Sequence, residues 1–341
     1  MRHLTRTVLF VTLLLAAITQ EAAASSPLII KLATLAPEGS SWHLILKEMG
    51  DQWRQVSNGR VLLKIYPGGV VGDETEMVSK MRLGTIHSAA VTGTGLSEID
   101  RGVQALQLPM FYRSDAELDA VRDRLAPKLE ERFAAKGFIV LAWGEAGWVY
   151  FFTRTPVVRP DDLKKQKLFT WAGDTMALDL WKAGGFKVVP LASTDIMPSL
   201  QTGMINAFAT PPAAALSFQW YSLAPNMTDL RWAPLVGAII IDKRTWDKIP
   251  ADAREAIRAA SRKAGEKLQT EVRKGSTESV KAMKEHRLTV VPVPHDAVLA
   301  WRTAAEGLYP KMRGFYVPAD MFDEAKRLVE GVRSHGNVRN D

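Results

Sequence analysis

Residue types that commonly perform catalysis are sparse in this sequence of 341 residues, which contains six histidines and no cysteine. A thiolate nucleophile and a thiolate metal site are therefore excluded. The sequence has no His-Glu-x-x-His pair, no Gly-x-Ser-x-Gly turn and no phosphate-binding loop with its lysine. Glu145 with His43 or His87 is the one acid–base pair that we can propose, and its spacing does not support an active site. We therefore predict a protein that is not an enzyme and that carries no cofactor and no metal.

Aromatic side chains are more informative, because many of the ten tryptophans fall in the central third of the chain. Most tryptophans in proteins fill hydrophobic cores. Trp148 and Trp171 differ, since each lies at the end of a predicted strand rather than within a periodic apolar face. Ligands of α/β proteins bind beyond the carboxyl ends of strands. These two side chains are therefore candidates for contact with a ligand.

The charge pattern argues against a nucleic-acid partner, although the formal net charge is +7. Lys and Arg are mixed with Asp and Glu along predicted helices such as 252–286. This mixing is typical of solvated helix faces rather than of a basic binding surface. We predict no nucleic-acid partner.

The first residues have the pattern of a secretory signal peptide. Arg2 and Arg6 precede an apolar run from 8 to 18, and small residues follow it. The run is shorter than the roughly 20 apolar residues that span a bilayer. We expect cleavage near Ala24 and export of residues 25–341 to the periplasm.

Predicted strands and helices alternate along the rest of the chain, which indicates an α/β fold. A first alternating series runs from 28 to 92 and predicts one sheet flanked by helices. A second series runs from 167 to 209 and predicts another. The sequence therefore indicates two α/β lobes.

A helical pattern from 252 to 286 is longer than a typical globular helix. It either lies across both lobes or is broken near Gly275. We assign the chain to a signal peptide at 1–24, a lobe I made of 25–150 and about 237–280, and a lobe II made of 151–236 and about 281–341.

Several motifs occur in order along the chain. The longest is Ile65–Glu74 (IYPGGVVGDE), which continues through Met77, Met81 and Arg82-Leu83-Gly84. Further motifs are Leu108–Phe111, Gly144–Gly147, Gly203–Ala207 and Trp246–Pro250. Together they closely resemble the solute-binding subunits of tripartite ATP-independent periplasmic (TRAP) transporters, the DctP family. The resemblance covers almost the whole chain after the leader.

This resemblance implies a two-lobe periplasmic-binding-protein fold, type II-like, with a hinge and a long helix spanning both lobes. The lobes would close around one small organic ligand. Closure would create the surface that docks onto the integral-membrane TRAP subunits. Such transporters run on an ion gradient, so this chain would need neither ATP nor a catalytic residue.

The sequence departs from the family in the second lobe, where the Arg of a Lys-Ile-Arg-like strand usually grips the carboxylate of the ligand. The corresponding segment here is Lys167-Leu168-Phe169, and Thr210 stands where the family often has Asn. Burying a carboxylate without a cationic partner costs several kcal/mol of desolvation. We therefore do not expect a simple dicarboxylate, and we expect a ligand with a larger apolar or aromatic part.

The expected site combines side chains of both lobes. Phe169, Trp171 and Trp148 would hold the apolar part, and Glu145 and Thr210 would orient it. In lobe I, backbone amides at turns and helix N-termini would donate to a polar group. The full expected set is Thr34, Trp42, Gly68, Gly69, Thr92, Gly93, Glu145, Trp148, Phe169, Trp171, Thr210 and Arg231.

Several alternatives stay open. Core packing is the alternative role for Phe169 and Trp42, and a surface or hinge salt bridge is the favoured alternative for Glu145. An organic acid would remain the ligand if Arg154 or Arg231, near predicted lobe crossings, supplied the missing cation. The same closing cleft would also serve a periplasmic ligand sensor.

Overall fold

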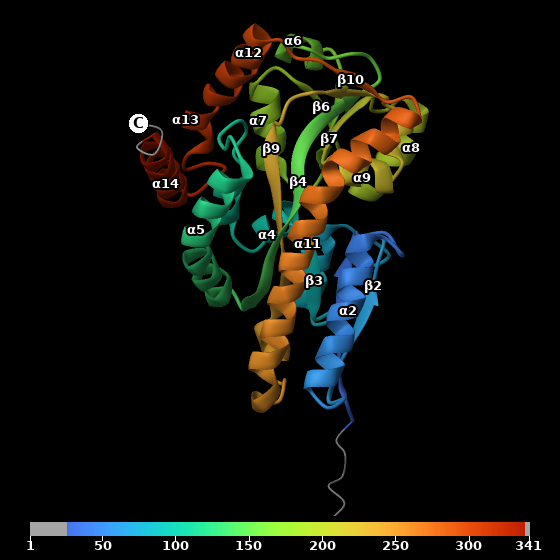
Figure 1. Cartoon of the computed structure of the whole chain (residues 1–341), viewed down its shortest axis with the longest axis vertical. Helices are drawn as coiled ribbons and strands as arrows, with labels where there is room; N and C mark the ends of the chain where they lie inside the picture. Colours follow the sequence, from blue (N-terminus) through green and yellow to red (C-terminus); the bar gives the residue numbers. More distant parts are fainter. Residues whose placement is uncertain (1–25, 338–341) are drawn as a thin grey trace, which may run out of the picture.

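Two lobes share one mixed β-sheet and one long helix in the computed structural model, which describes residues 26–337 (Figure 1). The strands are β1 (Leu28–Thr34), β2 (Val61–Tyr66), β3 (Ser88–Thr92), β4 (Phe138–Thr153), β5 (Lys167–Trp171), β6 (Lys187–Leu191), β7 (Ala207–Thr210), β8 (Asn226–Thr228), β9 (Ala233–Asp242) and β10 (Thr289–Val291). Their order in the sheet is β2-β1-β3-β9-β4-β7-β5-β6, with β8 paired to β4 and β10. The expected two-lobe α/β fold is confirmed.

Helices cover both faces of this sheet. The α-helices are α2 (Ser41–Val56), α3 (Glu74–Arg82), α4 (Gly93–Ser97), α5 (Asp115–Ala135), α6 (Pro160–Leu163), α7 (Thr175–Ala183), α8 (Ile196–Thr202), α9 (Pro212–Ser217), α10 (Lys243–Trp246), α11 (Ala251–Glu285), α12 (His295–Glu306), α13 (Tyr309–Met312) and α14 (Ala319–Asn337). Three short 3-10 helices are η1 (Arg101–Gln107), η2 (Ser193–Asp195) and η3 (Trp220–Ser222). No helix among the described residues is both long and apolar enough to cross a bilayer.

Strand β4 carries the chain from lobe I into lobe II. Its first part pairs antiparallel with β9, and its last residues, Tyr150–Thr153, pair antiparallel with β7. Irregularities in the β4–β9 register occur between Val140 and Ala142 and between Glu145 and Gly147. Such bulges bend and twist a strand. Gly147 has a φ of +112°, which side chains rarely adopt, so glycine suits the bend at the lobe crossing.

Helix α11 is continuous over 35 residues, and Gly275 does not interrupt it. It packs against α2 in lobe I, along β4, and against α9 in lobe II. Figure 1 shows it running beside β4 from one end of the molecule to the other. Ile257, Ala260 and Ala264 form part of its buried face, as the three- and four-residue spacing predicts. The expected helix spanning both lobes is therefore present.

The local sequence explains where the first helices begin. The Ser40 hydroxyl accepts from the backbone N–H of His43 at 3.3 Å and so caps α2. Asp73 and Glu76 form a capping box at the start of α3. Both caps lie just beyond the ends of β1 and β2, so they fix the loops that face lobe II.

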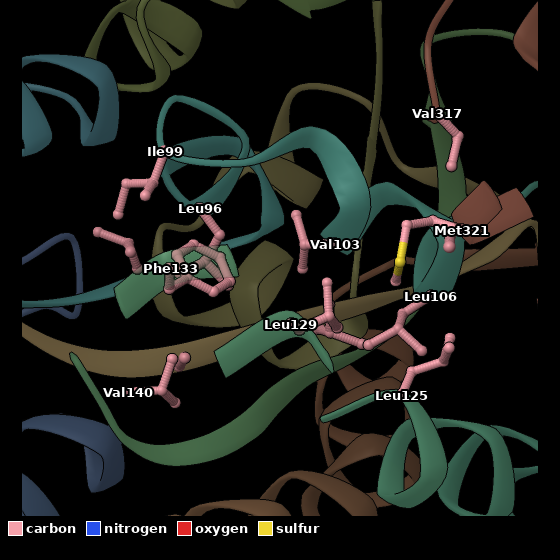
Figure 2. Packing of buried hydrophobic residues seen from close by; sticks show 14 of the residues in the cluster. Leu96, Ile99, Val103, Leu106, Leu125, Leu129, Phe133, Val140, Val317 and Met321 are labelled. Carbon is pink, nitrogen blue, oxygen red and sulfur yellow. The ribbon is translucent and has the colours of Figure 1, made fainter. Parts of the chain in front are cut away.

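The hydrophobic core of lobe I lies on both faces of its sheet. Alternate residues of β1 point to opposite faces. Leu32 packs against residues of α2 and α11 on one face, and Ala33 belongs to the core on the other face. Figure 2 shows the second face, where Leu125, Leu129 and Phe133 of α5 meet residues of η1 and α14.

The C-terminal segment corrects the expected lobe boundaries. We placed about 281–341 in lobe II, but α14 packs against α5 and η1 of lobe I. The cause is an apolar stripe on α14, where Met321, Ala325 and Leu328 are buried in the lobe I core. The predicted signal peptide lies outside the described residues.

Candidate ligand-binding site

A cavity of about 1070 Å³, counting its opening to solvent, lies between the two lobes. Lobe I contributes the loop after β1, the end of β3 and the start of α3. Lobe II contributes the ends of β5 and β7 and helices α8, α9 and η3. Residues of β4, β9 and α11 form the wall at the hinge. This position is the one that α/β architecture predicts for a ligand.

The lobe II wall of the cavity is aromatic. Phe169 and Trp171 alternate along β5, and their rings meet edge to face with centroids 5.0 Å apart. Phe169 is almost fully buried and belongs to the lobe II core while it also lines the cavity. Phe218 and Trp220 stack with centroids 4.6 Å apart and line the same wall. The wall therefore offers flat apolar surface to a ligand.

The lobe I wall contains one buried carboxyl group, that of Glu74. Glu74 Oε1 accepts from the backbone N–H of Thr92 at 2.9 Å, and Oε2 accepts from the Thr92 hydroxyl at 2.8 Å and the Gly95 N–H at 2.9 Å. Burial raises the pKa of Glu74 to about 7, even though these hydrogen bonds favour the charged form. No ion pair of Glu74 is present in the described structure.

A salt bridge at the hinge neutralises the second carboxyl group of the cavity wall. Arg273 of α11 donates to both oxygens of Glu145, at 2.6 and 3.0 Å, and to both oxygens of Asp119, at 2.7 Å each. The hydrogen bonds that Arg273 donates to Asp119 and Glu145 raise its pKa. Glu145 therefore lines the cavity and acts in the hinge salt bridge that we considered its favoured alternative role.

The cavity wall contains no Lys, Arg or His among the described residues that line it. The alternative cations lie elsewhere. Arg154 donates to the backbone oxygens of Leu200 and Leu223. Arg231 lies over the ring of Trp148, with its guanidinium carbon 5.3 Å from the ring centroid. Neither arginine is among the described residues that line the cavity.

The structure brings part of the expected site together. Seven of the expected residues line the cavity: Thr34, Trp42, Thr92, Glu145, Phe169, Trp171 and Thr210. The expectation that the other five do so is corrected: Gly68, Gly69, Gly93, Trp148 and Arg231 lie outside the lining.

Local hydrogen bonds explain why Gly68 and Gly69 do not line the cavity. The N–H of Gly68 donates to the Ala36 oxygen at 2.8 Å, and the N–H of Gly69 donates to the Thr34 oxygen at 3.0 Å. These amides therefore hold the loop after β1 and are not free for a ligand. Gly93 faces Gln107, whose amide a Cβ atom at position 93 would overlap.

Trp148 is displaced because its indole N–H donates to Asp115 at 2.7 Å, which turns the ring away from the cavity. Trp148 and Arg231 instead line a separate groove beside Arg273 and Lys284. Sequence reasoning missed Glu74, Trp143, Ser193, Phe218 and Trp220 as lining residues. Glu74 lies inside the longest family motif, so that motif could have indicated it as a lining residue.

Direct bonds join the two lobes. Asp73 of lobe I accepts from the N–H and the hydroxyl of Ser193 in lobe II, at 2.7 and 3.0 Å. Arg101 pairs with Asp174 at 2.8 Å, and the Tyr316 hydroxyl donates to the same carboxylate at 3.2 Å. These bonds connect the two lobes directly in the described conformation.

Two lobes and a cavity between them define a protein that binds a small molecule. Residues 32–314 match the DctP family, described as bacterial extracellular solute-binding protein, family 7. The chain belongs to this family of solute-binding proteins.

Two relatives by sequence are named for the solutes that they bind. The 2,3-diketo-L-gulonate-binding periplasmic protein YiaO of Escherichia coli is 24% identical over 287 residues, which cover 83% of this chain and 86% of YiaO. The C4-dicarboxylate-binding periplasmic protein DctP of Rhodobacter capsulatus is 23% identical over 270 residues, covering 77% of this chain and 79% of that protein.

Solved structures share the fold. The sugar acid binding protein DctPAm of Advenella mimigardefordensis, in complex with galactonate, superposes with a TM-score of 0.84 at 18% identity over 90% of this chain and 99% of that chain. A TRAP periplasmic solute-binding protein of Sulfurospirillum deleyianum with bound succinate gives a TM-score of 0.82 at 19% identity, covering 89% and 99%.

Proposed function

We propose that this chain is the periplasmic solute-binding subunit of a TRAP-type transporter and that its cavity takes an uncharged organic ligand with a sizeable apolar body. The charge of the cavity wall is the observation that supports this ligand class. A buried carboxyl group, Glu74, lines the cavity without a cationic lining residue to offset an anion.

Electrostatics disfavours an anionic ligand in this cavity. An organic acid would lose its hydration on closure and would meet no guanidinium or ammonium group in the wall. Above the raised pKa of Glu74 it would also meet a like charge. Both effects weaken the binding of acids such as the galactonate and succinate found in the similar structures.

The shape and chemistry of the wall favour an apolar ligand body. Phe169, Trp171, Phe218 and Trp220 cover the lobe II side, and Trp42 and Trp143 lie on the lobe I and hinge sides. Aromatic walls bind rings and other flat apolar groups through buried area and dispersion.

The leader and the surface of the two lobes would serve transport. The expected leader would export the chain, and the closed lobes would present one continuous surface to the integral-membrane TRAP subunits. Opening on those subunits would break the bonds between the lobes and release the ligand. Family membership supports this role, since the named relatives are solute-binding proteins rather than enzymes.

A thermal-shift screen of residues 25–341 tests the proposal, because a specific ligand raises the melting temperature by mass action. One half of the panel contains organic anions, including galactonate and succinate. The other half contains uncharged aromatic and alicyclic compounds of similar size. We expect shifts only in the uncharged half, and a strong shift with a small mono- or dicarboxylate would refute the proposed ligand class.

A further inference from the structure

Four aromatic rings of lobe II form a series of ring contacts that runs from the core to the cavity. Phe152 and Phe208 are buried, and their rings stack with centroids 5.2 Å apart and planes 3° apart. Phe208 meets Trp220 edge to face at 5.6 Å. Trp220 in turn stacks on Phe218, with centroids 4.6 Å apart and planes 13° apart. The series therefore ends at Phe218, which is half-buried and lines the cavity.

The last two rings form a rigid pair in the cavity wall. Trp220 is buried and belongs to the lobe II core, so it supports one face of the Phe218 ring. Both rings line the cavity, and Phe218 is the more exposed of the two. Phe218 is therefore the ring of the pair that offers the larger surface to a ligand.

Gln219, between the two rings, has a strained backbone. It joins α9 to η3 with a φ of +58° and a ψ of +19°, in the left-handed region that non-glycine residues rarely adopt. The other described non-glycine residues with a positive φ are Asn58, Met110 and Arg287, and none of them adjoins a lining residue of the cavity. Strained residues concentrate at ligand sites, where the surrounding structure holds them.

We propose that Phe218 and Trp220 form a stacking platform for a planar aromatic ring of the ligand, and that the left-handed turn at Gln219 positions this platform. A planar ring stacked on Phe218 gains an interaction beyond the area that it buries. A saturated ring is puckered and has no π-system, so it gains buried area alone. This inference rests on the proposed function, and it narrows the ligand class from apolar compounds in general to aromatic compounds.

Calorimetric titration with three compounds of one carbon skeleton tests the inference. 2-Naphthylmethanol has two planar rings, its decahydro analogue is fully saturated, and 2-naphthoate carries a carboxylate. The first two compounds share a hydroxyl group and are similar in size. The ratio of their affinities therefore reports stacking rather than buried area.

Each compound is titrated into the wild-type chain and into four variants. Phe218→Leu removes the ring and keeps an apolar side chain. Gln219→Val places a β-branched residue in a conformation that such residues rarely adopt, and Gln219→Asn is its matched control because asparagine tolerates the left-handed region. Phe315→Leu removes an exposed ring that does not line the cavity, and so controls for the loss of an aromatic side chain.

We expect the wild-type chain to bind 2-naphthylmethanol about fivefold more tightly than the decahydro analogue. Phe218→Leu and Gln219→Val should bring that ratio close to one, while affinity for the decahydro analogue stays near the wild-type value. Gln219→Asn and Phe315→Leu should keep the wild-type ratio. Phe218→Leu leaves the backbone turn unchanged, so it tests the platform independently of the folding of Gln219→Val.

The outcomes separate the inference from the proposed function. Equal wild-type affinity for the aromatic and the saturated compound, or an unchanged ratio in Phe218→Leu, overturns the platform and leaves the proposed function standing. An unchanged ratio in Gln219→Val, or an equal loss of affinity for both compounds, overturns the positioning role of Gln219. Tightest binding of 2-naphthoate overturns the proposed ligand class, and the inference with it. Binding of none of the three compounds counts against both.

Discussion

Glu74 shows how one buried group can set the character of a binding wall. Its carboxyl oxygens accept hydrogen bonds from Thr92 and Gly95, and burial still raises its pKa to about 7. The native chain therefore holds a proton on Glu74 at pH values where the unfolded chain has lost it. Glu145, in the same wall, differs because Arg273 balances its charge.

This pKa predicts a pH dependence of stability. Because the pKa of Glu74 in the folded chain lies above the usual glutamate value of 4.5, the native state binds more protons between about pH 4.5 and 7. The free energy of unfolding should therefore fall as pH rises through that window, by about 1.4 kcal/mol per pH unit and about 3 kcal/mol at most. Urea unfolding of the wild-type chain and of Glu74→Gln between pH 5 and 8 measures this contribution.

The slope against pH should be smaller in Glu74→Gln than in the wild-type chain. Glu38→Gln is the control, since Glu38 lies exposed in the loop after β1. Equal slopes for the wild-type chain and Glu74→Gln would show that Glu74 does not titrate in this range.

Two arguments from sequence pointed to side chains of the cavity wall. Trp171 was expected there because it ends a strand, and Phe169 and Thr210 were expected from the family resemblance; all three line the cavity. Trp148 followed the strand-end argument and lies outside the cavity, because Asp115, distant in sequence, accepts its indole N–H. Such a partner depends on packing between elements, which a sequence pattern does not contain.

At the scale of elements, helix α11 contacts both lobes and holds them in position relative to each other. Its close contact with β4 depends on Gly265, where a Cβ atom would lie 2.5 Å from the Trp143 oxygen and 2.9 Å from the Ala142 Cβ. Gly275, ten residues later, has no atom within 4 Å of such a Cβ. One helix therefore contains a glycine required by packing and a glycine that packing does not require.

The two glycines predict opposite effects on stability. Gly265→Ala should lower the free energy of unfolding by about 1–3 kcal/mol, because the added methyl group forces α11 away from β4. Gly275→Ala should raise it by about 1 kcal/mol, because alanine is the better helix former and meets no neighbour. Denaturant unfolding measures both, and a stable Gly265→Ala chain would show that α11 and β4 are not in tight contact.

Element boundaries were largely predictable because they depend on local chemistry. The spacing of apolar residues and the Ser40 cap predict α2, and the apolar periodicity of 252–286 predicts α11. The place of α14 was not predictable, because its apolar stripe fits either lobe by pattern alone. Only the tertiary structure shows that it completes the lobe I core.

At the scale of the whole molecule, polar bonds join the two lobes. Asp174 pairs with Arg101 across the lobes and also caps α7 by accepting from the Ala177 N–H at 3.1 Å. Asp73 similarly caps α3 and binds Ser193. Asp73 and Asp174 therefore each cap a helix and also bond the two lobes together.

Asp174→Asn separates these two roles, since asparagine caps helices well but carries no charge for Arg101. We expect the variant to keep wild-type stability and to release its ligand about fivefold faster, because the closed state loses about 1 kcal/mol. Stopped-flow dissociation measures the rate. The control is Asp323→Asn, which breaks the exposed Arg313–Asp323 pair instead, and equal rates in all three chains would contradict a fastening role.

The charge of the cavity is the central claim, and calorimetric titration of the wild-type chain and of Phe169→Arg with galactonate and succinate tests it most directly. We predict no detectable binding of either acid to the wild-type chain, because none of the described residues that line its cavity is a cation. We predict measurable binding of at least one acid to Phe169→Arg, because a guanidinium then stands where Phe169 lines the wall. Micromolar binding of either acid by the wild-type chain would contradict the account.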